Sequence, residues 1–214
     1  MTEYVTIESF DEPTQYETVI NKSRFISSVI YVENKEQATA FVTQIRKKYF
    51  DATHNCYAYI CDGAVKYSDD GEPQGTAGLP ILDNIKAKNL HNVCVVVTRY
   101  FGGVKLGKGG LTRAYGGGAS SVLAQCKIVE CRECSRITAS VSYSFCKVVT
   151  LCVGEYGVID NTEYFEKVIF TITTPINNLN KLKVALKDAT NGQITFGEES
   201  IVLKKFLKEV NKVE

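Results

Sequence analysis

The feature that most constrains the fold is a stretch in which an apolar strand runs into a glycine-rich loop and then into a helix. Residues 93–101 are almost entirely apolar, which predicts a strand buried on both faces. The loop and the start of the helix lie in residues 98–118, TRYFGGVKLGKGGLTRAYGGG. Apolar residues then recur at helical spacing, at Leu111, Ala114, Tyr115, Ala119, Val122 and Cys126. A strand that leads into a helix places free backbone N–H groups and the positive end of the helix dipole at the loop, where an anion can bind.

Charged residues are segregated along the chain, although the formal net charge of the whole chain is only +1. Residues 51–83 carry six acidic side chains and one basic side chain. Residues 84–129 carry no acidic side chain, and their basic residues are Lys86, Lys88, Arg99, Lys105, Lys108, Arg113 and Lys127. A basic, acid-free segment that coincides with the glycine loop favours a negatively charged partner.

Within the loop, Gly102, Gly107 and Lys108 have the spacing that begins a phosphate-binding nucleotide loop. The next residue is Gly109, which lacks the hydroxyl that would hold magnesium in such a loop. A nucleotide hydrolase is therefore disfavoured.

The residues predicted to bind an anion or a nucleic acid are basic, aromatic and glycine positions in and around this loop. They are Lys22, Arg24, Arg99, Tyr100, Gly102, Gly103, Lys105, Gly107, Gly109, Gly110, Arg113 and Tyr115. Aromatic side chains among basic ones can stack on nucleobases. We expect Tyr100 and Tyr115 to be exposed for this role, whereas Phe101 ends the apolar strand and is predicted to be core. The three glycines at 116–118 lie within the helical pattern and are predicted to allow close helix packing.

The chain of 214 residues is long enough for two domains, which we place at 1–130 and 131–214, with the junction between 127 and 136. The first domain is predicted to have strands at 16–20, 24–32, 56–61, 64–67 and 93–101. Its helices are predicted after a cap at Asn34 and Gln37, at 81–90, and across the glycine-rich helical pattern. The second domain is predicted to have strands at 137–143, 158–161, 166–174 and 193–205, with helices at 145–156 and 178–189. This βαββαβ order is typical of a ferredoxin-like sandwich, and the whole chain is predicted to be α+β.

The acidic turn at 68–80, SDDGEPQGTAGLP, leaves two interpretations open. One is an acid–base or metal site, because carboxylates and imidazole suit both kinds of chemistry. The side chains that could form it are His54, Asp69, Asp70 and Glu72. The other is an ordinary turn whose carboxylates hold the basic loop in shape by pairing with Arg99, Lys105 or Lys22. No metal-ligand spacing is present, so neither a metal nor another cofactor is predicted.

The cysteines favour a structural role in a reduced compartment. Cys131 and Cys134 form a CxxC pair, but zinc would need two more ligands, and we interpret the pair as coincidental. Cys56 shares a strand face with His54 and could be a thiol nucleophile, although a buried thiol is favoured. The N-terminal segment has no secretory pattern and no apolar run has membrane-spanning length. We therefore expect a cytoplasmic protein with no membrane partner.

Four sequence blocks resemble the signature of the IMPACT family in its bacterial two-domain form. They are KSRF at 22–25, DATHNCYAY at 51–59, SDDGEPQGTAGLP at 68–80 and YFGGVKLGKGGLTRAYGGGA at 100–119. The resemblance implies that the first domain has a ribosomal-protein-type α/β fold, similar to domain 2 of a small-subunit protein, with a βαβ crossover of the unusual hand. It also implies that the second domain is similar to a C-terminal domain of elongation factor G.

Together these observations favour a binding protein that regulates translation and uses the basic loop on RNA, on a ribosome or on a protein of the translation machinery. Eukaryotic IMPACT proteins restrain a starvation-responsive kinase that acts on an initiation factor. They do so through an additional N-terminal domain with no counterpart in this sequence, so that activity is not carried over. A third interpretation is a regulator that binds another protein through an apolar patch beside the loop.

The main alternative is an enzyme that acts on a phosphorylated or otherwise anionic small molecule. In that interpretation the loop holds the anion, and His54 with Asp69 or Asp70 transfers protons. It requires these side chains to reach the same cleft as Lys105.

Overall fold

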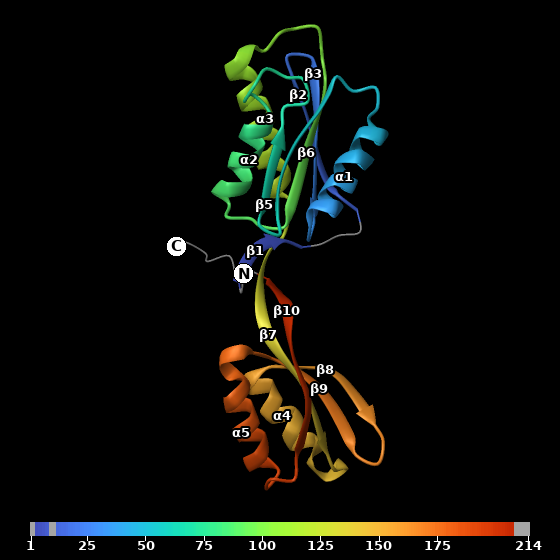
Figure 1. Cartoon of the computed structure of the whole chain (residues 1–214), viewed down its shortest axis with the longest axis vertical. Coiled ribbons are helices and arrows are strands. Elements are labelled where there is room, and N and C mark those ends of the chain that lie inside the picture. The colour runs from blue at the N-terminus through green and yellow to red at the C-terminus, as the bar shows by residue number, and fades with distance from the viewer. Residues whose placement is uncertain (1–2, 9–11, 208–214) are drawn as a thin grey trace. The chain divides into compact units, whose positions relative to one another are not determined.

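The structure is a computed structural model that describes residues 3–8 and 12–207, the last three by their backbone only (Figure 1). The chain divides into two compact units. The N-terminal unit contains Tyr4–Glu130, and the C-terminal unit contains Cys131–Phe206 together with Glu3. No helix within the described ranges is long and apolar enough to cross a membrane.

The N-terminal unit is built on a five-stranded sheet with the strand order β2-β3-β6-β4-β5, in which every neighbouring pair is antiparallel. Its strands are β2 (Thr14–Ile20), β3 (Ser23–Tyr31), β4 (His54–Cys61), β5 (Ala64–Ser68) and β6 (Val93–Tyr100). Helix α1 (Lys35–Lys48) packs on one face of the sheet, while α2 (Gly78–Ala87) and α3 (Gly107–Ala124) pack on the other (Figure 1). The sheet is therefore covered by helices on both sides.

The central strand β6 is buried on both faces, as its apolar run predicts. Its alternate side chains enter two different cores, because Val93, Val95 and Val97 pack with α2 and α3 while Cys94 and Val96 pack with α1. Strands β3 and β4 both pair antiparallel with β6, so they run parallel to each other, and α1 connects them. As a result β3 and β4 begin at the end of the sheet where β6 finishes.

Helix α1 begins at the predicted cap. Asn34 Oδ1 accepts a hydrogen bond of 2.9 Å from the backbone N–H of Gln37. The Gln37 side chain in turn accepts one of 2.7 Å from the backbone N–H of Glu33. These two bonds satisfy N–H groups that would otherwise have no partner at the helix start.

The C-terminal unit has the predicted βαββαβ order. Its elements are β7 (Ile128–Val141), α4 (Cys146–Tyr156), β8 (Val158–Tyr164), β9 (Val168–Pro175), α5 (Leu179–Ala189) and β10 (Thr195–Leu207). Strand β9 pairs antiparallel with β7 and with β8, and β10 also pairs with β7. Both helices contribute to one core, in which Val149 and Leu182 are fully buried. Two antiparallel sheets with helices in each unit confirm the predicted α+β class.

The structure differs from the predicted elements in three places. Strand β1 (Glu3–Ile7) is not predicted by the sequence pattern. The segment 127–136, within which the domain boundary is predicted, is largely strand, because β7 begins at Ile128 and its buried Val129 and Cys131 alternate with charged residues. Helix α2 begins at Gly78, three residues earlier than predicted, because Pro80 lies in its first turn, where proline is tolerated.

Candidate functional site

The first carboxylate of the acidic turn organises the backbone around it. Asp69 accepts hydrogen bonds from the backbone N–H groups of Gly75, Ala77 and Gly78, at 2.8, 3.0 and 2.9 Å. Two of these donors lie at the start of α2, which has no side-chain bond from its own cap residue, Ala77. Asp69 therefore caps this helix from a distance and closes the turn upon itself.

Asp70 also acts on neighbouring segments. Its carboxylate accepts a 2.7 Å hydrogen bond from the backbone N–H of Asn55 and forms an ion pair with Arg46. Its carbonyl oxygen accepts a 2.8 Å hydrogen bond from Nδ1 of His54. The carboxylates of Asp69 and Asp70, two of the predicted acid–base groups, thus have structural partners.

Glu72 and Arg99 form a buried ion pair at the end of the sheet. Arg99 Nη1 lies 2.6 Å from Glu72 Oε1, and the side chains are 6% and 4% exposed. The hydroxyl of Tyr115 donates a 2.7 Å hydrogen bond to the same carboxylate oxygen, and His54 Nε2 lies 3.9 Å from it. The interpretation in which an acidic-turn carboxylate pairs with Arg99 is confirmed.

Arg99 is also enclosed by aromatic rings. Its guanidinium carbon lies 5.6 Å from the ring centre of Phe25 and 5.5 Å from that of Phe101. Nη2 donates to the hydroxyl of Ser23 at 3.3 Å, while Nε has no hydrogen-bond partner among the described residues. Arg99 therefore connects the core to the loop that follows β6. Contrary to the prediction from the sequence, it is buried beneath this loop and is not exposed to bind an anion or a nucleic acid.

Tyr115 and Phe101 have the opposite exposure to that predicted. Tyr115 is fully buried, and its ring meets Phe25 edge to face at 5.4 Å between centres. Its position in the same helical stripe as Leu111 and Ala114 explains this burial. Phe101 is 48% exposed, because the strand ends one residue before it. The exposure predicted for Tyr115 and the burial predicted for Phe101 are both wrong.

The start of the glycine loop is packed against the turn between β2 and β3. Gly102 lies directly on the carbonyl of Lys22, where any side chain would overlap that backbone. Its N–H donates to the hydroxyl of Ser23 at 3.2 Å. Gly103 and Gly107 have φ angles of 83° and 69°, which only glycine adopts readily. The loop conformation thus depends on these glycines.

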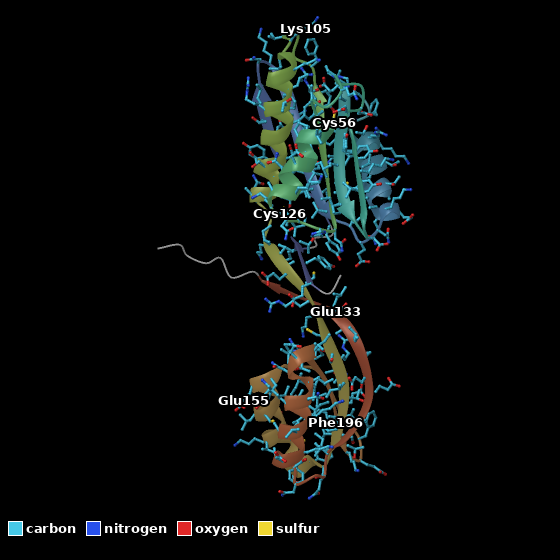
Figure 2. The ribbon with its side chains drawn as sticks, turned by 60° about the vertical axis from the view of Figure 1, so that its left-hand side comes forward. Cys56, Lys105, Cys126, Glu133, Glu155 and Phe196 are labelled. Atoms are coloured by element: carbon cyan, nitrogen blue, oxygen red, sulfur yellow. The ribbon has the colours of Figure 1, made fainter. Side chains whose placement is uncertain are left out.

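The exposed cations around the loop form what we call the basic face: Lys22, Lys105, Lys108 and Arg113. Figure 2 shows Lys105 at one end of the N-terminal unit. Within the described residues, no carboxylate lies within ion-pair distance of these four side chains. Lys108 is absent from the predicted set, although its place in the acid-free segment could have identified it.

The start of α3 lies within the basic face. Its first turn has no acidic residue, and its cap residue, Leu106, makes no side-chain hydrogen bond to the helix. Arg113 folds back so that Nη1 comes within 3.6 Å of the position of a Cβ on Gly109. Gly109 and Gly107 are themselves exposed, and Gly110 partly so. Backbone N–H groups and a guanidinium are thus presented together.

Two predicted binding residues are engaged elsewhere. Arg24 forms an exposed ion pair with Glu17 at 2.8 Å, and its guanidinium carbon lies 5.6 Å from the ring centre of Tyr100. The Tyr100 hydroxyl donates to Asp51 at 2.8 Å. Because Arg24 and Tyr100 have partners within the fold, the basic face has better candidates for a ligand.

The glycines at 116–118 differ from one another. A Cβ on Gly118 would come 2.6 Å from the Ser27 hydroxyl, and one on Gly116 would come 3.3 Å from Asn84. These two positions fit the predicted close packing. A Cβ on Gly117 would have nothing within 4 Å, so packing does not explain this glycine.

The candidate thiols are buried. Cys56 donates to the carbonyl of Asp69 at 2.9 Å, and burial raises the pKa of its thiol far above the ordinary range. Figure 2 shows Cys56 within the N-terminal unit. Cys131 and Cys134 are free and buried. Across the described residues, no three histidine, cysteine, aspartate or glutamate side chains come together in a group that could hold a metal ion.

Comparison with known proteins identifies the family. The model of the Impact N-terminal domain matches residues 21–123. The IMPACT family member YvyE of Bacillus subtilis is 36% identical over 216 residues, covering 99% of this chain and 98% of that protein. The IMPACT family member YigZ of Escherichia coli is 33% identical, covering 82% and 89%. A crystal structure of a hypothetical protein matches with a TM-score of 0.60 and 30% identity, covering 92% and 97%. The chain therefore belongs to the IMPACT family.

Proposed function

We propose that this protein binds RNA through the basic face and regulates a step connected with translation. The observation that carries the proposal is the set of four exposed cations around the uncapped start of α3, with no carboxylate to neutralise them among the described residues. Phosphate contacts supply most of the affinity of nucleic-acid-binding proteins, and they need exposed cations and free N–H groups of this kind. IMPACT membership supports the connection with translation.

The spread of the cations favours a polyanion over a single phosphate. Lys22 comes from the turn beside Gly102, Lys105 from the loop, and Lys108 and Arg113 from successive turns of α3. A chain of phosphates can contact all of them, whereas one small anion reaches a part of them. Four phosphate contacts predict that the logarithm of the binding constant falls with the logarithm of salt concentration with a slope of about −2.8 for a single strand.

The enzyme alternative has less support from the geometry. Asp69 and Asp70 stabilise backbone segments, and Glu72 is neutralised by Arg99. His54, the other predicted acid–base group, is bonded through Nδ1 to the carbonyl of Asp70, and its Nε2 faces the buried Glu72 at 3.9 Å. The buried thiol of Cys56 keeps its proton. A general base needs a free acceptor within reach of a substrate, and these groups already have partners inside the fold.

We also infer the finer fold assignments implied by the family. The order β8-β9-β7, with β10 also paired to β7 and two helices in one core, supports a ferredoxin-like sandwich. The parallel pair β3 and β4 on either side of β6, connected by α1, supports the ribosomal-protein-type α/β fold. A division near residue 130 is supported by the grouping of Tyr4–Glu130.

The test is the salt dependence of RNA binding by fluorescence anisotropy. The double variant Lys105→Ala, Arg113→Ala is expected to reduce the slope by about 1.4, because two phosphate contacts are lost. The matched control Lys47→Ala, Lys66→Ala removes the same charge from exposed positions outside the basic face and is expected to leave the slope unchanged. Absence of RNA binding at low salt, or an equal effect of both double variants, would overturn the proposal. Copurification with ribosomes at low salt distinguishes ribosome binding from binding of free RNA.

A further inference from the structure

Phe101 has the geometry of a fixed, exposed aromatic platform. It follows a strand whose residues are buried up to Arg99, yet it is 48% exposed. Its backbone N–H donates to the hydroxyl of Thr53 at 3.0 Å, which fixes the chain at this point. Val104, three residues later, is also exposed, at 42%. A large apolar ring is thus presented to solvent from a firmly held backbone.

The ring is supported from within by Arg99. The guanidinium carbon lies 5.5 Å from the ring centre of Phe101, and Arg99 is itself held by Glu72, Ser23 and Phe25. A ring held in this way loses little conformational freedom when a ligand binds, so its contact contributes more to affinity than that of a mobile side chain. The cation–π interaction with Arg99 also stabilises the ring of Phe101 in this position.

Phe101 adjoins the basic face. It precedes Gly102, whose backbone touches the carbonyl of Lys22, and Lys105 lies four residues along the loop. Isolated exposed apolar residues are common on protein surfaces and need no function. Phe101 is instead held in place beside exposed, unneutralised cations. Surfaces that bind single-stranded nucleic acids combine the same two features: basic side chains contact the phosphate backbone, and aromatic rings stack on the bases.

We propose that Phe101 stacks on an unpaired base and that the RNA bound by the basic face is single-stranded. This inference rests on the proposed function, since it names the form of RNA and one of the residues that selects it. In a duplex each base is stacked and paired, so its flat face is not available to Phe101. The ring can therefore contribute to binding of a single strand and adds nothing to binding of a duplex.

The experiment compares one fluorescein-labelled 12-nucleotide RNA of mixed sequence, either single or annealed to its complement. The full-length chain is expected to bind the single strand more tightly. Phe101→Ala is expected to weaken single-strand binding about tenfold, within the range for one base–aromatic stack, and to change duplex binding less than about twofold. Phe101→Leu keeps an apolar side chain over Arg99 and is expected to behave like Phe101→Ala, while Phe101→Tyr retains binding. Phe165→Ala, at an exposed phenylalanine of the C-terminal unit, is the matched control and is expected to have no effect.

The outcomes separate the two proposals. Equal affinity for single strand and duplex, with no effect of Phe101→Leu, overturns the stacking role while leaving RNA binding by the basic face intact. Equal weakening of both RNA forms by Phe101→Leu also overturns it, because the residue then only positions the loop. Failure of either RNA to bind at low salt removes the proposed function itself. If Phe101→Ala does not fold, as judged by circular dichroism, the comparison of Phe101→Leu with Phe101→Tyr decides the question.

Discussion

Removing the Glu72 carboxylate is expected to lower the stability of the N-terminal unit, because the charge of Arg99 is then buried without a partner. The two side chains are 4% and 6% exposed, so water cannot replace the lost carboxylate. Breaking a buried ion pair by removing one partner costs about 3–5 kcal/mol. The hydroxyl of Tyr115 loses its acceptor at the same time. A loss of about 4 kcal/mol corresponds to a fall of about 10–20 °C in Tm for a domain of this size.

The measurement is thermal and urea unfolding of Glu72→Ala, Arg99→Ala and the double variant Glu72→Met, Arg99→Met. The double variant is expected to recover much of the loss, since replacing both charges by apolar groups of similar volume is often neutral. The control is Glu17→Ala, which breaks an exposed ion pair on the same sheet and is expected to leave the unfolding midpoint nearly unchanged. A shift for Glu72→Ala as small as that for Glu17→Ala would refute the structural role of the buried pair.

Three further changes test other parts of the N-terminal unit. Gly102→Ala is expected to lower the free energy of unfolding by about 2 kcal/mol or more and to abolish RNA binding, because a Cβ there overlaps the neighbouring backbone. Gly117→Ala is expected to raise the free energy of unfolding by up to about 1 kcal/mol, because a Cβ there meets nothing. Urea unfolding distinguishes the two variants. Asp69→Ala is expected to cost about 1–2 kcal/mol, since it removes the cap from α2, and a midpoint unchanged in urea would argue against that role. Burial raises the pKa of the Cys56 and Cys94 thiols, so the stability they contribute is complete below the ordinary thiol pKa of about 8.5 and is lost as the pH rises above it. The urea midpoint is therefore expected to be lower at pH 10 than at pH 7. A higher midpoint at pH 10 would contradict the assignment.

The elements with strong local signals could be predicted from the sequence. The central strand β6 could be predicted because a continuous apolar run of this length indicates a strand buried on both faces. The start of α1 could be predicted because Asn34 and Gln37 form a local helix-capping motif. The first half of β7 was predicted only as part of a junction, although charged residues such as Glu130 and Arg132 alternate with buried ones in a strand pattern. The change in composition at this point masked the strand, whose pairing partners lie far away in sequence.

The candidate site could be predicted only in its composition. The acid-free basic segment is visible in the sequence, and so is the dependence on glycine. Which cations are free is not visible, because Arg99 meets Glu72 only after β6 and the acidic turn have packed together. The exposure of Tyr115 and Phe101 depends on which turn of α3 faces the sheet and on the residue at which β6 ends. Both are tertiary properties.

The meeting of two strand starts and one strand end has a consequence for protein synthesis. Ser23 begins β3, His54 begins β4 and Arg99 lies next to the end of β6. Tyr115, whose hydroxyl donates to Glu72, follows in α3. Contacts between such distant positions form late, because the intervening chain must first be ordered. A nascent chain therefore cannot complete the contacts of Arg99 and Tyr115 with Glu72 until residue 115 has left the ribosome. We expect the loop that follows β6 to reach its folded shape only near the end of the synthesis of the N-terminal unit.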